Sequence, residues 1–464
     1  MTSRLVLLLG TWQPDRGVAA SLAERVRALV LDGRLTVGER LPSERVLAQE
    51  LGRSRATITA AYGRLEAAGY VVRTHGGGTH IALPHSSAVR PTLPGSAPID
   101  FSIASTGSAP GLHEATIRAL PRLAAQRGGT GYTLEGLREL REMIASRYHE
   151  RGVPTEADEI IITSGAMHAL ALVLAAFSRP GRVAVVEEPT FPHAMDAIRR
   201  AGHRLVTTPV AAGGWDVGHL TTTLLDLHPH LAYLIPDFHN PTGANMSDAD
   251  RAVVVATARS AGTMLIVDET CADLDIDRPF TPSPFAAFGD VITLGSLSKI
   301  AWGGLRIGWI RASRAVVSRI LAVRPTIDLG TAPLEQCIAI ELLHDVPALQ
   351  QHVRSRLAAG RAAVRTGLES IGLTMPVTHG GLAVWIGLHG FDSTALSLAA
   401  HDHGLRLPPG PRFSASGVLN GYLRLPITLD PETTADGMLR LAAAWQDVHR
   451  GPVTHAAMEH LAVV

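Results

Sequence analysis

Residues 294–310 read LGSLSKIAWGGLRIGWI, and they contain Lys299, the only lysine in the chain. The sequence has 42 lysine and arginine residues in total, so the other cations are all arginines. For charge, ion pairing and phosphate binding, arginine serves as well as lysine or better. A lysine kept at one position therefore indicates a task that needs an amine able to lose its proton.

A deprotonated lysine can attack a carbonyl carbon, and pyridoxal 5'-phosphate (PLP) is an aldehyde cofactor that proteins hold in this way. A surface lysine retained by accident could stand at any cationic position. Lys299 instead ends a Ser-x-Ser-Lys run formed with Ser296 and Ser298, and Arg306 follows seven residues later with two glycines between. This context predicts that Lys299 is the catalytic lysine of a PLP site.

The composition indicates a large, soluble protein. The chain has 464 residues, of which 46% are hydrophobic and 18% are charged, so we expect two or three domains with substantial cores. Two cysteines, Cys271 and Cys337, make no disulfide framework and suit a reducing compartment. The apolar run at residues 5–10 is short for a signal peptide and no run reaches transmembrane length, so we expect a cytoplasmic location and no membrane. The 21 histidines are scattered, and we expect no metal site.

The chain divides by composition. The formal net charge is zero, but residues 1–82 hold 11 arginines against 7 acidic residues, which is a local basic excess. Residues 83–98 carry four prolines among small residues and predict a linker. Residues 99–450 form the largest unit, with a smaller α+β lobe from about 340 to 450, and residues 451–464 form a tail.

Short apolar segments alternate with alanine-rich helical segments after the linker. The predicted strands lie in EIIITS (159–164), RVAVVE (182–187), LAYLIP (231–236), MLIVDE (264–269) and VITLGS (291–296). Such alternation is typical of an α/β fold, and it predicts a parallel sheet.

The N-terminal unit begins with residues 19–35, whose apolar positions have helical spacing. Residues 41–52, LPSERVLAQELG, predict a short helix that is capped by Ser43 and ends at the glycine. Residues 53–70, RSRATITAAYGRLEAAGY, predict a second helix that starts at Ser54. Two helices joined by a tight turn form a helix-turn-helix unit, whose second helix enters the DNA major groove by its N-terminus.

The second helix and the segment after it carry the candidate DNA contacts. Arg53, Arg55, Thr57 and Thr59 lie at the leading end of the helix. Residues 70–83 predict two strands around a Gly76-Gly77-Gly78 turn, which is a wing suited to phosphates or the minor groove. Arg73 lies in the first of these strands and belongs to the same predicted surface.

The order of these motifs resembles the winged helix-turn-helix of the GntR family over about residues 18–83. The matching segments are LPSER (41–45), LA (47–48), SRxT (54–57), AYxxLE (61–66), GY (69–70) and the glycine-rich wing. The resemblance implies DNA contacts at Ser43, Arg45, Arg55, Thr57 and the wing residues His75 to Gly77. The alternative is an interaction domain that has lost DNA binding.

The central unit has a candidate for each end of a bound PLP. A phosphate needs backbone amides at a helix N-terminus, and residues 163–170, TSGAMHAL, supply them through Ser164, Gly165, Ala166 and Met167. Arg306 offers a guanidinium to the phosphate, and Ser296 and Ser298 offer hydroxyls.

The ring of the cofactor has separate needs. Asp268, at the carboxyl end of a predicted strand, is the candidate for keeping the pyridine nitrogen protonated. Asn240, in HNPTG, is the candidate donor to the phenolic oxygen, and Phe191, in EEPTFP, is the candidate for stacking on the ring. A single phenylalanine is more often a core residue.

Together these residues resemble the fold-type-I, aspartate-aminotransferase-like PLP enzymes over about residues 99–450. The resemblance implies that Tyr132 reaches the cofactor phosphate of a neighbouring subunit, and hence a homodimer. It also implies that Arg424, in GYLRLP, binds the α-carboxylate of an amino acid.

Cys271 departs from that family. The family pattern is Asp-x-x-Tyr, with the tyrosine hydroxyl on the phenolic oxygen of PLP, and here Cys271 occupies the tyrosine position. A thiol is a poor hydrogen-bond donor, so we expect the cofactor to bind but transamination to be weakened. The alternative is that a nearby hydroxyl replaces the tyrosine.

A GntR-like domain linked to an aminotransferase-like domain resembles the MocR/GabR regulators throughout the chain. The resemblance implies a PLP-dependent transcriptional regulator that binds double-stranded DNA and senses an amino acid or PLP. Two alternatives stay open: an active aminotransferase with an accessory DNA-binding domain, and a non-catalytic module that has lost PLP. Cys271 argues against the first, and the intact Lys299, Asp268 and Arg306 argue against the second.

Overall fold

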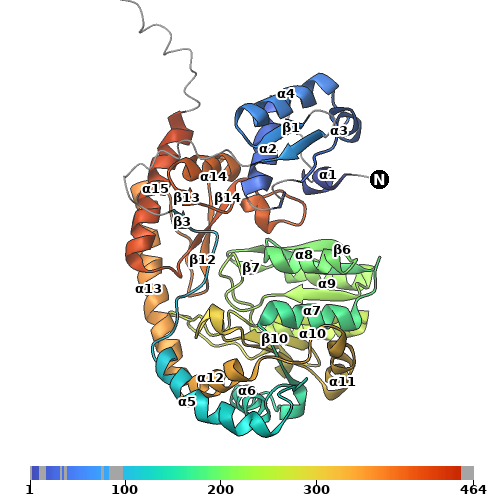
Figure 1. Ribbon diagram of the computed structural model, residues 1–464, viewed down its shortest axis with the longest axis vertical. Helices are drawn as coiled ribbons and strands as arrows, with labels where there is room; N and C mark the ends of the chain where they lie inside the picture. Colours follow the sequence, from blue (N-terminus) through green and yellow to red (C-terminus); the bar gives the residue numbers. More distant parts are fainter. Residues whose placement is uncertain are drawn as a thin grey trace, which may run out of the picture.

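The computed structural model describes residues 3–9, 17–31, 34–35, 39–74, 78–82 and 98–450. The chain has three parts, which are an N-terminal domain, a large central domain and a C-terminal lobe (Figure 1). Most of the predicted linker and the whole predicted tail lie outside the described residues.

The N-terminal domain is a helix-turn-helix with a β-hairpin. Its elements are α1 (Arg4–Leu9), α2 (Val18–Leu31), α3 (Glu44–Leu51), α4 (Arg55–Ala67), β1 (Val71–Thr74) and β2 (Gly78–Ile81). The hydroxyl of Ser43 accepts from the Val46 amide at 3.3 Å, and Gly52 ends α3 in the left-handed conformation. The hydroxyl of Ser54 accepts from the Thr57 amide at 3.1 Å and begins α4. The predicted helix starts are confirmed, and β1 pairs antiparallel with β2 as the predicted wing requires.

The central domain is built on a sheet of eight strands. Their order across the sheet is β4 (Ile160–Thr163), β11 (Gly308–Arg311), β10 (Ile292–Ser296), β9 (Met264–Asp268), β8 (Leu231–Leu234), β5 (Val183–Glu188), β6 (Arg204–Ala211) and β7 (Gly214–Trp215). All five strands predicted from the sequence are present.

The sheet is mixed, whereas the sequence predicted a parallel one. Strands β5, β6, β8, β9 and β10 are parallel, but β11 runs antiparallel to both β10 and β4, and β7 runs antiparallel to β6. A parallel crossover needs about a dozen or more residues, usually including a helix. Residues 297–307 connect β10 to β11 without an α-helix, so the chain turns back beside the strand it has just left.

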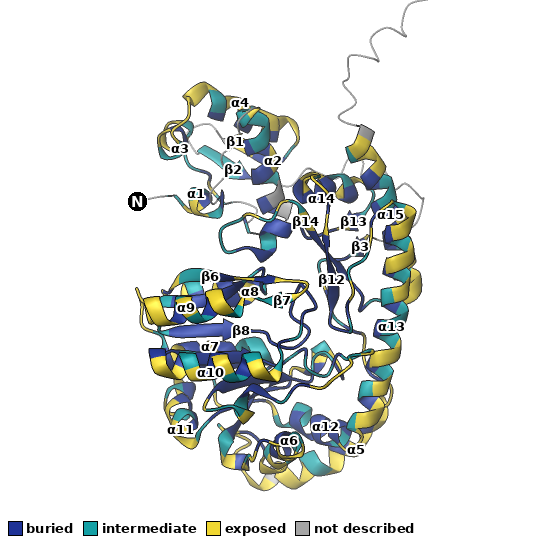
Figure 2. Ribbon diagram, turned by 180° about the vertical axis from the view of Figure 1, so that it is seen from behind, coloured by how far each residue is buried: buried dark blue, intermediate teal, exposed yellow. Residues whose placement is uncertain are grey.

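Helices cover both faces of the sheet (Figure 2). Strands β4, β8, β10 and β11 are fully buried, whereas β6 and β7 at one edge are partly exposed. One face packs against α7 (Ala166–Phe177), α8 (Pro192–Arg200) and α11 (Arg314–Val323). The other face packs against α9 (Val217–Leu227) and α10 (Asp248–Ala261), and at the β4 edge against α5 (Leu112–Ala125), α6 (Arg138–Glu150) and α12 (Pro333–Leu343). Successive side chains of a strand point to opposite faces of the sheet. In β4, Ile161 therefore packs in the core with α7, α8 and α11, while Ile160 and Ile162 pack in the core with α5, α6 and α12.

The C-terminal lobe is a smaller α+β unit, as the sequence predicts. It contains β12 (Ala383–Gly387) paired antiparallel with β14 (Tyr422–Pro426), together with α13 (Val346–Ser370), α14 (Ser393–Asp402) and α15 (Pro431–Arg450). A short strand from the start of the central unit, β3 (Ile99–Asp100), pairs with β13 (Leu405–Arg406) in this lobe. The chain therefore enters the lobe before it forms the large sheet.

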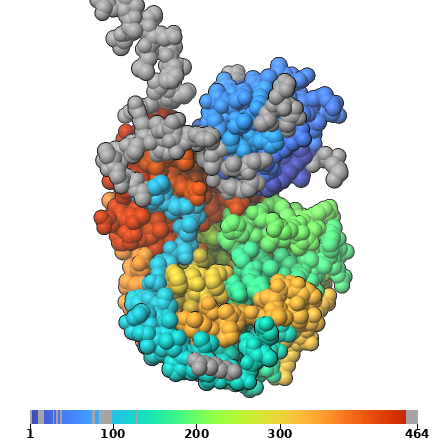
Figure 3. Space-filling view, in the orientation of Figure 1, coloured from blue at the N-terminus to red at the C-terminus, as the bar shows by residue number. Residues whose placement is uncertain are grey.

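The N-terminal domain lies against the C-terminal lobe (Figure 3). Helix α2 packs on α14, and the Arg25 guanidinium donates to the Gly417 carbonyl at 2.9 Å. An ion pair of 3.9 Å joins Arg27 to Asp402 at the same contact. In the part of the chain that is described, no helix has the length and apolar character needed to span a membrane.

Candidate functional site

A cavity of about 380 Å³ lies where the carboxyl edge of the large sheet faces the C-terminal lobe. It brings together most of the cofactor residues predicted from the sequence, namely Ala166, Met167, Phe191, Asn240, Asp268, Cys271, Ser296, Ser298, Lys299, Arg306 and Arg424. These residues are separated by more than 250 positions in the chain, so their convergence is a property of the fold.

The strand ends explain this convergence. Asp268 and Ser296 are the last residues of β9 and β10, and Asn240 and Phe191 follow β8 and β5. In an open α/β sheet, the carboxyl ends of parallel strands meet along one edge, where ligands bind. The antiparallel turn after β10 then places Lys299 over the same edge.

Lys299 lies in the wall of this cavity. Its Nζ donates to the Ala104 carbonyl at 3.1 Å. Burial lowers the pKa of the Lys299 amine, and the positive charges of Arg424 and Arg306 act in the same direction, while Asp268 opposes them. A lowered pKa makes the unprotonated amine, which is the nucleophile, easier to reach at neutral pH.

The turn before α7 lets the Arg306 guanidinium approach the backbone closely. Gly165 has φ 89°, and a Cβ there would lie 2.5 Å from Nη2 of Arg306. That guanidinium donates to the Ser164 carbonyl at 2.7 Å and to the Gly303 carbonyl at 3.2 Å. The turn thus places a guanidinium beside the first amides of α7, which have no acceptor inside the helix.

Ser296 holds the backbone of the connection between β10 and β11 through two hydrogen bonds. Its hydroxyl donates to the Ile307 carbonyl at 2.9 Å and accepts from the Ser298 amide at 3.1 Å. Arg306 has a left-handed backbone, with φ 54°, which costs energy for a non-glycine residue. The connection between β10 and β11 is therefore held in an unusual shape that points Lys299 and Arg306 at one cavity.

Asp268 is fixed by two donors. The Tyr233 hydroxyl donates to Oδ2 at 2.5 Å, and the Thr270 amide donates to Oδ1 at 2.9 Å. Burial raises the pKa of the Asp268 carboxyl, and the hydrogen bonds from Thr270 and Tyr233 lower it. The two donors therefore favour the carboxylate form inside a buried site.

Arg424 lies at the far end of the cavity, on β14 of the C-terminal lobe. Its Nη2 donates to the Ser102 carbonyl at 2.5 Å, and its guanidinium lies 5.0 Å from the centre of the Phe413 ring. Its Nε is buried without a hydrogen-bond partner among the described residues. Burial lowers the pKa of Arg424 to about 10, so the side chain stays charged at neutral pH.

Tyr132 is outside this cavity and is 68% exposed. Its predicted contact with a neighbouring subunit remains a prediction, because the structure contains one chain. Among the described residues, no group of three or more histidine, cysteine, aspartate or glutamate side chains is arranged to hold a metal ion.

The predicted DNA surface lies on α3, α4 and β1. Ser43, Arg45, Arg53, Arg55, Thr59 and Arg73 are exposed, and Thr57 is half-buried. Glu44, which the sequence did not single out, accepts a hydrogen bond of 2.7 Å from the Thr59 hydroxyl and lies 3.4 Å from Arg73 and 3.7 Å from Arg55. Glu44 therefore aligns the leading end of α4 with the wing. The predicted contacts His75 and Gly77 lie outside the described residues.

Known families match both parts of the chain. The family of bacterial regulatory proteins called gntR matches residues 18–81, and the aminotransferase class I and II family matches residues 104–441. The chain belongs to the aminotransferase class I and II family. Its N-terminal domain is a GntR-type helix-turn-helix.

Several relatives share both parts. The uncharacterized HTH-type transcriptional regulator YisV of Bacillus subtilis is 27% identical over 82% of this chain and 87% of its own. The HTH-type transcriptional regulator TauR of Rhodobacter capsulatus is 26% identical over 92% of this chain and 97% of its own. Among solved structures, the α-aminoadipate aminotransferase LysN of Thermus thermophilus, in complex with N-(5'-phosphopyridoxyl)-L-leucine, has 28% identity and a TM-score of 0.69 over 76% of this chain and 93% of its own.

The cofactor of this aminotransferase family is PLP, and the cavity fits it. Lys299 offers an amine, Asp268 a carboxylate, and Arg306 with the α7 amides an anion site. The Asn240 side-chain oxygen is buried with no hydrogen-bond partner among the described residues, so this amide can turn toward a bound polar group. The lack of a side chain at Gly165 leaves room for the Arg306 guanidinium, which lies where a Cβ would otherwise be.

Cys271 stands at the position where the aminotransferase pattern has a tyrosine. It is buried in the cavity wall, and burial raises the pKa of its thiol to about 12. The thiol is therefore protonated and uncharged at neutral pH. The Tyr233 hydroxyl does not replace the missing tyrosine, because it donates to Asp268.

Two positioning residues were missed from the sequence. His168 accepts from the Ser164 amide through Nδ1 at 3.0 Å, and its Nε2 lies 3.3 Å from Asp328. Burial lowers the pKa of His168, so it is neutral with its proton on Nε2. Tyr233 is the other, and its only signal in the sequence is an aromatic hydroxyl inside an otherwise aliphatic strand.

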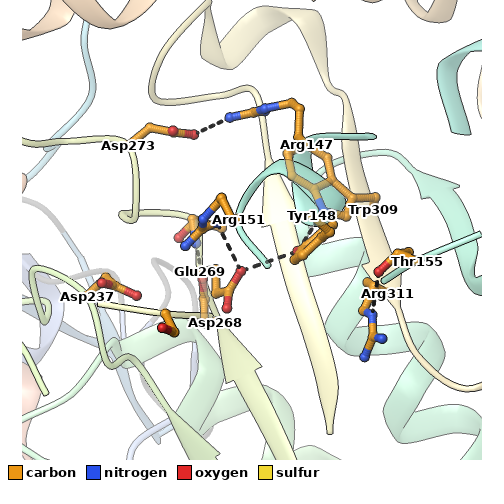
Figure 4. A network of polar contacts seen from close by, with 12 residues as sticks. Arg147, Tyr148, Arg151, Thr155, Asp237, Asp268, Glu269, Asp273, Trp309 and Arg311 are labelled. Carbon is orange, nitrogen blue, oxygen red and sulfur yellow. Dashed lines mark hydrogen bonds and ion pairs between the residues drawn. The ribbon is translucent and has the colours of Figure 1, made fainter. Parts of the chain in front are cut away.

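A buried polar network supports the end of β9 from behind the cavity (Figure 4). Glu269 accepts from the Tyr148 hydroxyl at 3.3 Å and lies 3.7 Å from Arg151, and Trp309 donates to the Tyr148 oxygen at 3.2 Å. Burial raises the pKa of the Glu269 carboxyl, and the charge of Arg151 lowers it. The network ties α6 and β11 to the residue that follows Asp268.

We expect the purified protein to be yellow and to lose that colour in Lys299→Ala and Lys299→Arg. The arginine variant keeps the positive charge but cannot form the covalent bond, because its guanidinium does not lose a proton. Borohydride reduction followed by peptide mass spectrometry should find the cofactor label on Lys299. Label elsewhere, or a wild-type protein that stays colourless after PLP is added, would contradict the assignment.

Tyr233→Phe should weaken PLP binding by roughly tenfold or more, because a hydrogen bond to a charged group is worth about 1.5–3 kcal/mol. Removal of that donor raises the pKa of Asp268 further above its ordinary value. The carboxylate therefore becomes protonated at a higher pH, and the variant should lose the cofactor at a higher pH than wild type on acidification. PLP affinity measured by absorbance across a pH series tests this.

Tyr148→Phe is the matched control for that experiment. It also removes one buried tyrosine hydroxyl, but from Glu269 instead of Asp268. The control should keep the wild-type pH profile of PLP binding. Equal profiles in all three proteins would show that Tyr233 does not act on Asp268.

Proposed function

We propose that this protein is a PLP-dependent transcriptional regulator, which binds double-stranded DNA through its N-terminal domain and senses an amino acid in the cavity. The observation that carries the proposal is one chain with a GntR-type DNA-binding domain packed on the lobe that supplies Arg424. The names of YisV and TauR, which share both parts, support it. Such a function also places the protein in the cytoplasm.

The side chains in the cavity have separable tasks. Lys299 would hold PLP through its amine, and the bound cofactor would supply an electrophilic carbon that can react with amines. The Asp268 carboxylate, oriented by Tyr233, holds a proton on the ring nitrogen. Arg306 and the α7 amides hold the phosphate, and Arg424 binds the carboxylate of the amino acid.

The signal can pass through the segment 414–417. The Ser414 hydroxyl and the Ala415 amide both donate to Glu188 of the large domain, the latter at 3.0 Å. The Gly417 carbonyl accepts from Arg25 of the DNA-binding domain. One short segment therefore touches both other parts of the chain, and a shift of the lobe around bound ligand would change how the DNA-binding domain is held.

An active aminotransferase is the second candidate. The complete set of Lys299, Asp268 and Arg424 favours it, as does the likeness to LysN. Cys271 weighs against it, because a neutral thiol replaces the hydroxyl donor of that family. Sustained production of keto acid over many turnovers would favour the enzyme over the sensor.

DNA binding should fall steeply with salt and depend on two arginines in different ways. Arg55→Ala should cost about 1–3 kcal/mol on a specific site, because Arg55 lies at the leading end of α4 where bases are read. Arg45→Ala should weaken all sequences alike through loss of a phosphate contact. Fluorescence anisotropy with genomic and scrambled duplexes measures both.

Arg64→Ala is the control for the DNA experiment, since Arg64 is an exposed arginine in the last turn of α4, away from the leading end. Its affinity should equal that of wild type. If Arg45 and Arg55 can be removed without any change in specific or nonspecific affinity, the domain does not read DNA as proposed.

We further propose a homodimer in which Tyr132 contacts the partner's cofactor phosphate. Tyr132 is exposed and lies outside the cofactor cavity of its own chain, so a contact with a cofactor phosphate would have to cross a subunit interface. Tyr132→Phe should lower PLP affinity several-fold, and dilution to monomer should lower it in wild type. Sedimentation that finds a stable PLP-bound monomer at micromolar concentration would contradict the dimer.

A further inference from the structure

A second cavity, of about 220 Å³, adjoins the cofactor cavity on the side of the C-terminal lobe. Both cavities are lined by Ser102, Phe191, His193 and Arg424, so Arg424 stands at their junction. The rest of the second cavity is formed mainly by α14 and by the segment that leads to Phe413. It therefore lies beyond the point at which the carboxylate of an amino acid is proposed to bind.

The lining of this second cavity is positive. It contains Arg406, Arg412 and Arg424 as well as two histidines, and no aspartate or glutamate lines it within the described part of the chain. The Arg406 side chain is 64% exposed and pairs with Asp100 at 3.3 Å, so it belongs to the rim. The Arg412 side chain is only 15% exposed and is thus the inner cation besides Arg424.

Arg412 and Arg424 both place positive charge near His193. Burial lowers the pKa of His193, and the charges of Arg412 and Arg424 both act on it in the same direction, against Asp196. Arg412 pairs with Asp196 at 3.3 Å, but a guanidinium has five donors and can hold a second anion beside the first. His193 is neutral and can donate one hydrogen bond without adding charge.

We infer that the effector is an acidic amino acid, whose side-chain carboxylate binds Arg412 while its α-carboxylate binds Arg424. The inference rests on the proposed sensing function and names the class of molecule sensed. A neutral side chain would bring no second anion to Arg412, which would keep only its ion pair with Asp196. A basic side chain would meet two guanidinium groups in a cavity that, among the described residues, no carboxylate lines. Both classes are disfavoured by the lining.

The test uses the PLP-loaded full-length protein and pairs of amino acids of equal shape. L-Glutamate is compared with L-glutamine, and L-aspartate with L-asparagine, by isothermal titration calorimetry and by the visible absorbance of the cofactor. The acidic member of at least one pair should bind roughly ten- to hundredfold more tightly, as expected for a hydrogen bond to a charged group. L-Lysine should bind more weakly than any of the four.

Variants then assign the preference to a residue. Arg412→Gln should reduce the ratio of the affinities for the acid and its amide to near one, and it should leave the affinity for the amide unchanged. Arg412→Lys should restore part of the preference for the acid. Arg200→Gln removes the same charge from an exposed position on α8 outside the cavity, and it should behave as wild type. Glutarate, which has no amine, should also bind more tightly than glutaramate in wild type and not in Arg412→Gln.

The outcomes separate this inference from the function on which it rests. If the protein binds neutral or basic amino acids more tightly than acidic ones, the inference is wrong, but the proposed sensing function stands. A preference for acids that survives in Arg412→Gln would overturn the role of Arg412. A protein that binds no amino acid, or neither PLP nor DNA, would overturn both.

Discussion

The cofactor cavity depends on the antiparallel return of the chain between β10 and β11. Because residues 297–307 contain no crossover helix, β11 has to pair beside β10, and the connection stays at the carboxyl edge of the sheet. That connection carries Lys299 and Arg306, and a left-handed backbone at Arg306 turns its guanidinium toward the start of α7. A parallel β11 would need a crossover long enough to carry these side chains away from the cavity.

The electrostatics of the cavity follow from burial. A buried amine loses affinity for its proton, and a buried carboxyl gains it, so without other contacts Lys299 and Asp268 would both tend toward neutral forms. Hydrogen bonds from Tyr233 and Thr270 oppose the effect of burial on the pKa of Asp268 and favour its carboxylate form. The positive charges of Arg306 and Arg424 favour the free amine of Lys299, and the two guanidinium groups offer two anion sites in the same cavity.

The two halves of the molecule share the C-terminal lobe. This lobe supplies Arg424 and the inner cation Arg412 to the cavities, and its α14 packs against α2 of the DNA-binding domain. Residues 414–417 follow Phe413, on which Arg424 stacks, and they bond to both Glu188 and Arg25. A ligand that binds Arg424 therefore acts only a few residues from the contact with the DNA-binding domain.

The sequence by itself determined the local features. Ser43 and Ser54 as helix caps, the five apolar strands, and the single amine at Lys299 are each written in a short stretch of residues, because capping, alternation and nucleophilicity depend on neighbours in the chain. Most of the residues predicted to hold the cofactor line one cavity, since Asp268, Ser296, Asn240 and Phe191 end or follow parallel strands and such ends meet at one edge. The direction of β11, the hydrogen bond from Tyr233 to Asp268, the role of Glu44 between helix and wing, and the position of Arg412 beside Arg424 were decided only by the tertiary structure. Each of these joins residues that are distant in the sequence or depends on which way a strand turns, and no local pattern of residue types encodes such a contact.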